Sequence, residues 1–269
     1  MATRFCILGS GSSGNAAFLH TGGARILIDA GFSARRLGEL LAAIGESLDH
    51  IDAIFLTHEH GDHATGLNGL KKYPRLPVFA NAATAAAVAR SVDRPIEWQL
   101  FETGSRFRFR DLTVDAFSVP HDAADPVGFV FSWGDGDLLS PRRRLGWLTD
   151  LGHVPQLVRE HVRAVDVLVL EANYDAKMLQ DDLKRPWSLK QRIAGRHGHL
   201  SNQAAREFLI TTETNSWRQI FLTHLSRDCN SLDAVAREFA AITGAAGRPS
   251  PYQLTPVAPG TATEVLELA

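Results

Sequence analysis

The stretch that decides the fold of this chain is Ile54-Phe55-Leu56-Thr57-His58-Glu59-His60-Gly61-Asp62-His63, in which an apolar run stops and three histidines and an aspartate follow. The apolar run predicts a buried β-strand, and the polar residues predict a loop at its end. Imidazoles and carboxylates bind Zn²⁺, Mn²⁺ and iron in proteins. His58 and His60 can share one metal while Asp62 and His63 reach a second. A solvated polar loop is the alternative, but histidine is a scarce residue that seldom clusters without a use.

The composition predicts one folded domain. The chain has 269 residues, of which 45% are hydrophobic, and this is enough for one layered core. Its 28 basic and 30 acidic residues exclude the global positive field of a histone-like DNA-binding protein, but not a local basic groove. Cys6 and Cys229 are the only cysteines, and no signal peptide or long apolar run is evident. We therefore expect a soluble, cytoplasmic protein without a membrane partner.

Short apolar runs alternate with helical stretches along the chain, which predicts α/β layers. No internal repeat or long linker interrupts this pattern, so a single domain over residues 1–269 is expected. The expected strands cover residues 4–8, 24–29, 51–56, two segments within 107–119, 128–133, 146–149, 165–170 and 219–223. The expected helices cover residues 35–44, with Ser33 as the N-cap, 82–90, 154–163, 203–211 and 232–242.

Three further strand ends carry residues that bind metals. His121 and Asp122 follow one apolar run, Asp150 follows a second, and His224 follows a third. Loops held at the ends of strands are where folded domains usually place their chemistry. A single residue of this kind is more often a solvated loop residue, but its repetition at successive strand ends indicates a common site.

These motifs resemble the metallo-β-lactamase superfamily, whose histidine motif HxHxDH is followed along the chain by a histidine, an aspartate and a histidine. The resemblance implies the four-layer αββα metallo-β-lactamase sandwich, with two mixed sheets between outer helices. It also implies a ligand set of seven residues. His58, His60 and His121 would hold one metal ion, Asp62, His63 and His224 would hold the second, and Asp150 would bridge the two.

A site with these ligands suits hydrolysis. Two divalent ions hold a bridging hydroxide at neutral pH and stabilise charge on the attacking and leaving oxygens. The hydroxide would then be the nucleophile, and Asp62 would orient it as ligand and base. The histidine-rich set accepts two Zn²⁺ or Mn²⁺ ions, and iron also fits.

The glycine-rich run Gly9-Ser10-Gly11-Ser12-Ser13-Gly14-Asn15 predicts a contact with phosphate. Its glycines allow backbone N–H groups to form an anion-binding nest beside the side chains of Ser12, Ser13 and Asn15. The alternative is a plain Gly/Ser turn, because the run lacks the lysine of a nucleotide-binding loop.

The segment Gly198-His199-Leu200-Ser201-Asn202 predicts a second phosphate contact. Ser201 or Asn202 can cap the following helix, whose positive end would attract a phosphate near His199. Plain capping without a ligand is the alternative. His199 is also the leading proton donor to the leaving oxygen. Nearby cations would favour a nucleic-acid backbone, or else form a solvated face: Lys184, Arg185, Lys190, Arg192 and Arg196.

Within the superfamily, the chain is most similar to the bacterial YycJ (WalJ) branch. The similarity rests on Gly9–Asn15, His121-Asp122-Ala123, Glu171-Ala172-Asn173, Gly198–Asn202 and His224-Leu225-Ser226. That branch is regarded as a metal-dependent DNA exonuclease of mismatch repair, so the resemblance implies phosphodiester cleavage on DNA. Glu171 and Asn173, just past an expected strand, are expected to support the ligands, and the Glu171 carboxylate to fix a ligand histidine through its far ring nitrogen.

Three functions stay open on this reasoning. The first is a dinuclear phosphodiesterase acting as a DNA exonuclease, and the second is a hydrolase of a small ester, thioester or cyclic phosphate diester. The third is a metal-binding or redox module that holds two irons without hydrolysing anything. Hydrolysis of β-lactams is not expected, because nothing in the sequence suggests export.

Overall fold

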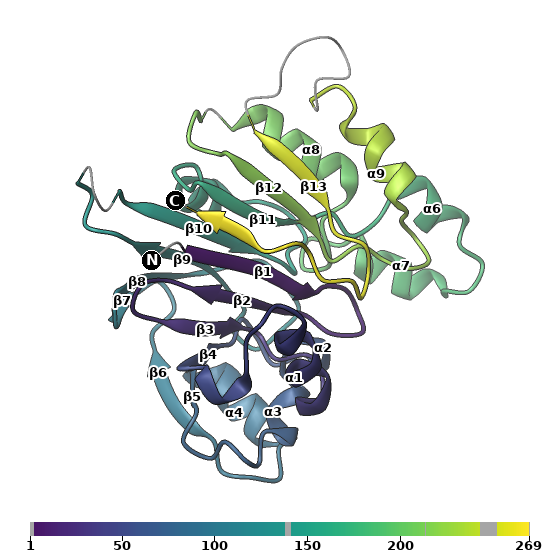
Figure 1. The fold of residues 1–269 in the computed structure, drawn as a ribbon. Coiled ribbons are helices and arrows are strands. Elements are labelled where there is room, and N and C mark those ends of the chain that lie inside the picture. The colour runs from purple at the N-terminus through teal and green to yellow at the C-terminus, as the bar shows by residue number, and fades with distance from the viewer. Residues whose placement is uncertain (1–2, 138–140, 213, 243–251, 269) are drawn as a thin grey trace. The chain divides into compact units, whose positions relative to one another are not determined.

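The computed structural model describes residues 3–137, 141–212, 214–242 and 252–268, which form two compact units (Figure 1). Unit 1 contains Met1–Ala116, Ala123–Val127 and Gly260–Ala269, and unit 2 contains Phe117–Asp122 and Gly128–Pro259. Strands and helices are mixed in both units, which confirms the predicted α/β class. The prediction of one domain over residues 1–269 stays a prediction.

Unit 1 is built on a mixed sheet with the strand order β14-β1-β2-β3-β4-β5-β6. Strands β3 to β6 run parallel to one another. The pairs β14–β1, β1–β2 and β2–β3 are antiparallel. The strands are β1 (Thr3–Gly9), β2 (Ala16–His20), β3 (Arg25–Ile28), β4 (Ala53–Phe55), β5 (Pro77–Asn81), β6 (Glu97–Phe101) and β14 (Leu266–Leu268). An antiparallel hairpin of β7 (Arg106–Phe109) and β8 (Leu112–Ser118) follows β6.

Helices of unit 1 cover the sheet through apolar side chains. Leu37 and Leu41 of α1 (Ala34–Ala43) are fully buried in one core cluster with Leu27 and Ile54 of the sheet. Ser33 accepts a hydrogen bond from the Arg36 backbone N–H, which confirms it as the N-cap. The other helices are the single-turn η1 (Leu48–His50), α2 (Gly61–Ala64), α3 (Gly66–Gly69) and α4 (Ala82–Ala89).

Unit 2 contains strands in the order β13-β12-β11-β10-β9. Strands β10 to β13 are parallel, and β9 pairs antiparallel with β10. The strands are β9 (Val127–Trp133), β10 (Arg143–Leu148), β11 (Val167–Glu171), β12 (Gln219–Thr223) and β13 (Gln253–Pro256). The helices are α5 (Gln156–Val162), α6 (Ala176–Asp181), α7 (Trp187–Ile193), α8 (Asn202–Thr211) and α9 (Leu232–Phe239).

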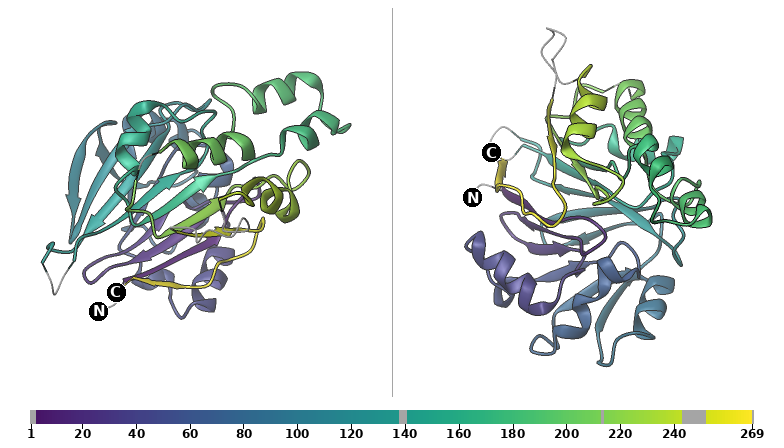
Figure 2. Two further views of the ribbon diagram at one scale, coloured as in Figure 1. Left: turned by 90° about the horizontal axis from the view of Figure 1, so that it is seen from above. Right: turned by 90° about the vertical axis from the view of Figure 1, so that its right-hand side faces the viewer.

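The register of the parallel strands aligns their carboxyl ends. Leu148 of β10 lies beside Leu170 of β11, which in turn lies beside Leu222 of β12. Helices α8 and α9 pack on these strands, with Phe208 and Phe239 buried in the same core cluster as the strand leucines (Figure 2). The loops after β10, β11 and β12 therefore leave the sheet at one edge.

Most of the expected elements are confirmed within one to three residues, but several were not predicted. Strands β2, β5, β6, β13 and β14 lie where no strand was expected, and the short helices α2, α3, α6 and α7 lie where no helix was expected. No helix in the described part of the chain is long and apolar enough to cross a membrane.

Candidate metal centre

In unit 1, a buried aspartate holds the histidine loop in place. Asp29 follows β3, is completely buried, and accepts hydrogen bonds from the Thr57 backbone N–H at 2.8 Å and the Thr57 hydroxyl at 3.0 Å. Its Oδ2 lies 2.8 Å from His63 Nδ1, so this ring nitrogen donates and Nε2 stays available as a ligand. Burial raises the pKa of Asp29, and His63 and Thr57 work against that shift.

The four predicted ligands of the loop lie together in unit 1. The ring of His58 lies 4.6 Å from that of His60 and 4.2 Å from that of His63, measured between centroids. Asp62 Oδ2 lies 3.5 Å from His63 Nε2. His58 and His63 are buried, whereas His60 and Asp62 are half-buried, so two of the four potential metal ligands are partly exposed to solvent.

The glycine-rich run supports this loop through Asn15. The buried Asn15 amide lies with its Nδ2 3.2 Å from Asp62 Oδ2 and 3.0 Å from His63 Nε2. Its Oδ1 accepts from the Gly11 backbone N–H at 2.9 Å, and the Asn15 N–H donates to the Asp62 carbonyl at 2.7 Å. Ser12 and Ser13, by contrast, are exposed. Asn15 thus contacts the ligand loop, and contact of these three residues with substrate stays a prediction.

In unit 2, three parallel strands end in groups that bind metals. Asp150 follows β10, Glu171 ends β11, and His224 follows β12. Asp150 Oδ1 lies 3.4 Å from His224 Nδ1 and 3.8 Å from His121 Nε2. One ligand atom each from Asp150, Glu171, His199 and His224 lies within 4.8 Å of the others. The structure therefore brings the predicted His121, Asp150 and His224 together, and adds His199.

Glu171 orients two histidines at once. Its Oε1 lies 2.8 Å from His199 Nδ1 and 2.7 Å from His224 Nδ1, and Oε2 accepts from the backbone N–H groups of Leu151 and Leu200. Burial disfavours ionisation of this carboxyl, yet His199 and His224 outweigh it and hold the Glu171 pKa at about 2. The expected orienting role of Glu171 is confirmed. Asn173 instead holds the backbone of the same histidine, since its Nδ2 donates to the His224 carbonyl at 2.7 Å.

His121 and His199 are set up differently by their surroundings. His121 Nδ1 lies 2.9 Å from the Gly198 carbonyl, and burial lowers the His121 pKa, which favours the neutral ring that a metal needs. Burial also disfavours the charged form of His199, but Glu171 and Asp150 outweigh it and raise the His199 pKa. The His199 side chain is 23% exposed, so its ring is accessible to a reacting molecule.

Backbone strain is concentrated at these strand ends. Among the described non-glycine residues, positive φ angles occur at Asp29 (61°), Asp150 (57°) and His224 (55°), and at Arg110 in the turn between β7 and β8. The left-handed region costs an ordinary residue roughly 1–2 kcal/mol, although Asp and His enter it more readily than most. Such strain is retained where the surrounding structure fixes the side chain's direction, as it does at all three site residues.

The segment that follows His199 serves the fold. Ser201 accepts from the Ala204 backbone N–H at 3.1 Å and is the N-cap of α8, as predicted. Asn202 is fully buried, and its amide exchanges two hydrogen bonds of 2.9 Å with Asn230. The predicted contacts of Ser201 and Asn202 with substrate remain predictions.

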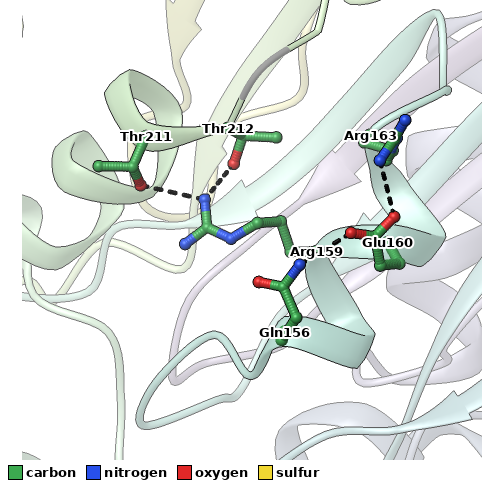
Figure 3. A pocket seen from close by; sticks show the side chains of 6 residues that line it. All are labelled: Gln156, Arg159, Glu160, Arg163, Thr211 and Thr212. Carbon is green, nitrogen blue, oxygen red and sulfur yellow. Dashed lines mark hydrogen bonds and ion pairs between the residues drawn. The ribbon is translucent and has the colours of Figure 1, made fainter.

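A cavity of about 390 Å³ between α5 and the end of α8 is organised around an arginine (Figure 3). Arg159 donates to the Phe208 carbonyl at 3.2 Å, to the Thr211 hydroxyl at 3.0 Å and to the Thr212 hydroxyl. These bonds tie α5 to the last turn of α8, where the Thr212 backbone N–H also donates to the Phe208 carbonyl at 3.1 Å. The cavity lining contains a single carboxylate, Glu160, and no histidine, so it is no second metal site.

The donor sets of both units fit divalent metal ions. Imidazole and carboxylate ligands suit zinc, manganese and iron, and ligand histidines in metalloproteins usually donate their far nitrogen to a carboxylate or carbonyl. His63, His121 and His224 all have such a partner. Asp29 was not predicted as a site residue, although its place after an apolar strand was the same signal that identified Asp150.

Comparison with known proteins agrees with this geometry. Residues 24–225 match the family model of the beta-lactamase superfamily domain. The chain is 36% identical to exodeoxyribonuclease WalJ of Streptococcus pneumoniae serotype 2 (strain D39), over 84% of this chain and 83% of that protein. It is 33% identical to exodeoxyribonuclease YycJ of Bacillus anthracis, over 88% and 87%.

A solved structure extends the similarity to the fold. The metallo-β-lactamase fold protein YhfI from Bacillus subtilis matches with a TM-score of 0.69 and 14% identity, over 98% of this chain and 99% of that chain. The predicted metallo-β-lactamase fold is therefore confirmed. The chain belongs to the metallo-β-lactamase superfamily, in the branch that contains WalJ and YycJ.

Proposed function

We propose that this protein is a dinuclear metal-dependent phosphodiesterase that degrades DNA as an exonuclease. One observation carries the proposal. Glu171 holds His199 and His224 beside Asp150 at the ends of three parallel strands, so a metal ligand and a proton donor share one anchor. The relatives that are 33–36% identical over most of the chain are named exodeoxyribonucleases, which supports DNA as the substrate.

The metal ligands we propose are those that the superfamily pattern implies. Four of these histidines have Nδ1 within hydrogen-bond distance of a hydroxyl, a carboxylate or a carbonyl, which supports a ligand role for the other ring nitrogen: His58, His63, His121 and His224. The first metal would be bound by His58, His60 and His121, the second by Asp62, His63 and His224, with Asp150 bridging them.

Side chains of this protein would supply the proton transfers. Divalent ions bound here would neutralise phosphate charge and activate water. Asp62 orients the attacking water and accepts its proton. His199 donates a proton from Nε2 to the leaving oxygen while its Nδ1 stays bonded to Glu171, which stabilises the charged ring before the transfer.

The two bound ions we propose are both Zn²⁺ or both Mn²⁺, and iron is the third choice for these ligands. A role in cytoplasmic DNA repair follows from the sequence-based expectation and belongs to the same proposal.

The test is a nuclease assay with purified protein loaded with Mn²⁺ or Zn²⁺. DNA labelled at its 5′ or its 3′ end, single- and double-stranded, should lose nucleotides from one end, and the label released first identifies the direction. His60→Ala and Asp62→Asn should abolish the release. Intact DNA together with hydrolysis of a small ester, thioester or cyclic phosphate diester would replace this proposal with the alternative hydrolase.

A further inference from the structure

The segment between Leu183 and His197, called here the α7 arm, exposes large apolar side chains. Leu183 is 98% exposed and Trp187, the first residue of α7, is 67% exposed. Helix α7 contains no buried residue, so core packing does not explain its composition. In both views of Figure 2, α6 and α7 lie on the outside of the strands of unit 2. Ile193 at the end of α7 packs against the small core cluster of Tyr174, Leu179 and Cys229, whereas the Trp187 indole at its start stays exposed close to Leu183 in the chain. Two large exposed apolar side chains so close together in the chain point to a binding partner.

The α7 arm is also basic throughout. Its sequence contains no aspartate or glutamate, and it contains Lys184, Arg185, Lys190, Arg192 and Arg196. Three of these cations pair with carboxylates outside the arm, namely those of Asp122, Asp182 and Asp228. Lys190 donates to the Gln180 carbonyl, and neither it nor Arg196 has an ion-pair partner among the described residues. An indole among such cations matches the stacking and charge that single-stranded DNA needs.

The α7 arm is joined directly to the candidate proton donor. The His199 backbone N–H donates to the Ile193 carbonyl at 2.8 Å, and a Cβ at Gly198 would lie 2.2 Å from that same oxygen. The end of α7 and His199 are therefore fixed to each other. Trp187 begins the helix that ends at Ile193, so it lies about 9 Å along the axis at roughly 1.5 Å per residue. At about 3.4 Å per nucleotide, the rise of one strand in duplex DNA, this length corresponds to roughly three nucleotides.

We propose that the α7 arm binds single-stranded DNA, with Trp187 stacked on a base about three nucleotides from the bond that is cut. Lys190 and Arg196 contact the phosphates between Trp187 and His199. The inference rests on the proposed DNA hydrolysis and adds the surface that guides the strand to it.

Binding is measured separately from cleavage. A fluorescent, phosphorothioate-linked single strand of about twelve nucleotides, a length within the usual range of single-strand sites, is titrated with the Mn²⁺-loaded full-length chain and followed by anisotropy. Trp187→Ala should weaken binding about 5- to 100-fold, as expected for the loss of one stacked base, and Trp187→Phe should restore most of it. Lys190→Gln should weaken binding and lower the salt slope by about one. Leu157→Ala, an exposed leucine on α5 at 64%, is the matched control.

Substrate length sharpens the test. The Trp187→Ala penalty on kcat/KM should be absent for bis(p-nitrophenyl) phosphate and dinucleotides, and should appear at about four nucleotides, where the strand first reaches the indole. Equal affinity of Trp187→Ala and the parent chain for the single strand overturns the inference. A substitution that changes only the oligomeric state of the protein, and not its affinity for DNA, overturns it as well. Either result leaves the proposed function standing if the parent chain still degrades DNA. Trp187-dependent binding without any cleavage refutes the proposed function and keeps the arm as a DNA-binding surface.

Discussion

The two units supply metal-binding groups in contrasting ways. Unit 1 presents four potential ligands within six consecutive residues, His58 to His63, in the loop after β4 and in the short helix α2. Unit 2 presents His121, Asp150 and His224, which span more than one hundred positions of the chain, and Asp150 and His224 meet because the parallel strands before them end at one edge of the sheet. A local site of the first kind is visible in a sequence motif, whereas a site of the second kind depends on strand register.

The buried carboxylates beneath the ligands differ in how many histidines they hold. Asp29 accepts from Thr57 and His63, so it fixes one ligand histidine. Glu171 accepts from His199, His224 and two backbone N–H groups, so it fixes two histidines that lie on separate segments. Substitution of Glu171 should therefore disturb more site residues than substitution of Asp29.

The largest expected effect comes from the ligands themselves. His60→Ala in unit 1 and His224→Ala in unit 2 should each abolish metal-dependent DNA hydrolysis and lower the metal content per chain, because each removes a donor that no neighbour replaces. Elemental analysis and nuclease assays measure both. His50→Ala, at an exposed histidine, is the matched control and should behave as the parent chain. If only one of the two variants loses activity, the units do not act on the same reaction.

The next effect separates proton donation from metal binding in unit 2. His199→Gln should lower kcat by about 10²- to 10⁴-fold, the usual contribution of a general acid, and leave the metal content unchanged. His197→Gln, two residues away and exposed, should have little effect. A loss of bound metal in His199→Gln would instead make His199 a ligand.

The two buried carboxylates give a smaller and graded effect. Glu171→Gln and Asp29→Asn keep the side-chain shape, and each should weaken metal affinity or activity by about 10- to 100-fold. Glu171→Gln should fall at the upper end because two histidines lose their acceptor. Competition with a chelator measures the affinity, and circular dichroism checks the fold. Equal losses in the two variants would contradict the contrast drawn between the units.

The smallest effect on catalysis is expected at Asn202. Replacement with alanine removes both hydrogen bonds between the buried Asn202 and Asn230 amides, which should cost about 1–3 kcal/mol of the free energy of unfolding. Urea denaturation measures this cost, with Gln191→Ala at an exposed position as the control. Values of kcat and KM should stay close to those of the parent chain. A large rise in KM with unchanged stability would return Asn202 to the substrate site.

Much of the fold was predictable because apolar periodicity reflects burial. Strands β3, β4, β9 and β12 and the cap of α1 follow from local patterns. Strand β6 (Glu97–Phe101) was missed because its alternation covers only the four residues Glu97 to Leu100 and it is largely exposed. Helices α2 and α3 have four residues each, which is too short for a helical period to show.

The sequence by itself determined the nature of the ligands, because imidazole and carboxylate groups at strand ends carry metal chemistry whatever their surroundings. It also determined the family, through the histidine loop and the later ligands. Only the tertiary structure decided how these groups are held. Glu171 meets His224 because their strands run parallel in register, His199 reaches the same carboxylate from the segment before α8, and Asn15 contacts Asp62 from the turn after β1. Such pairings join residues far apart in the chain, and local sequence patterns contain no information about distances between them.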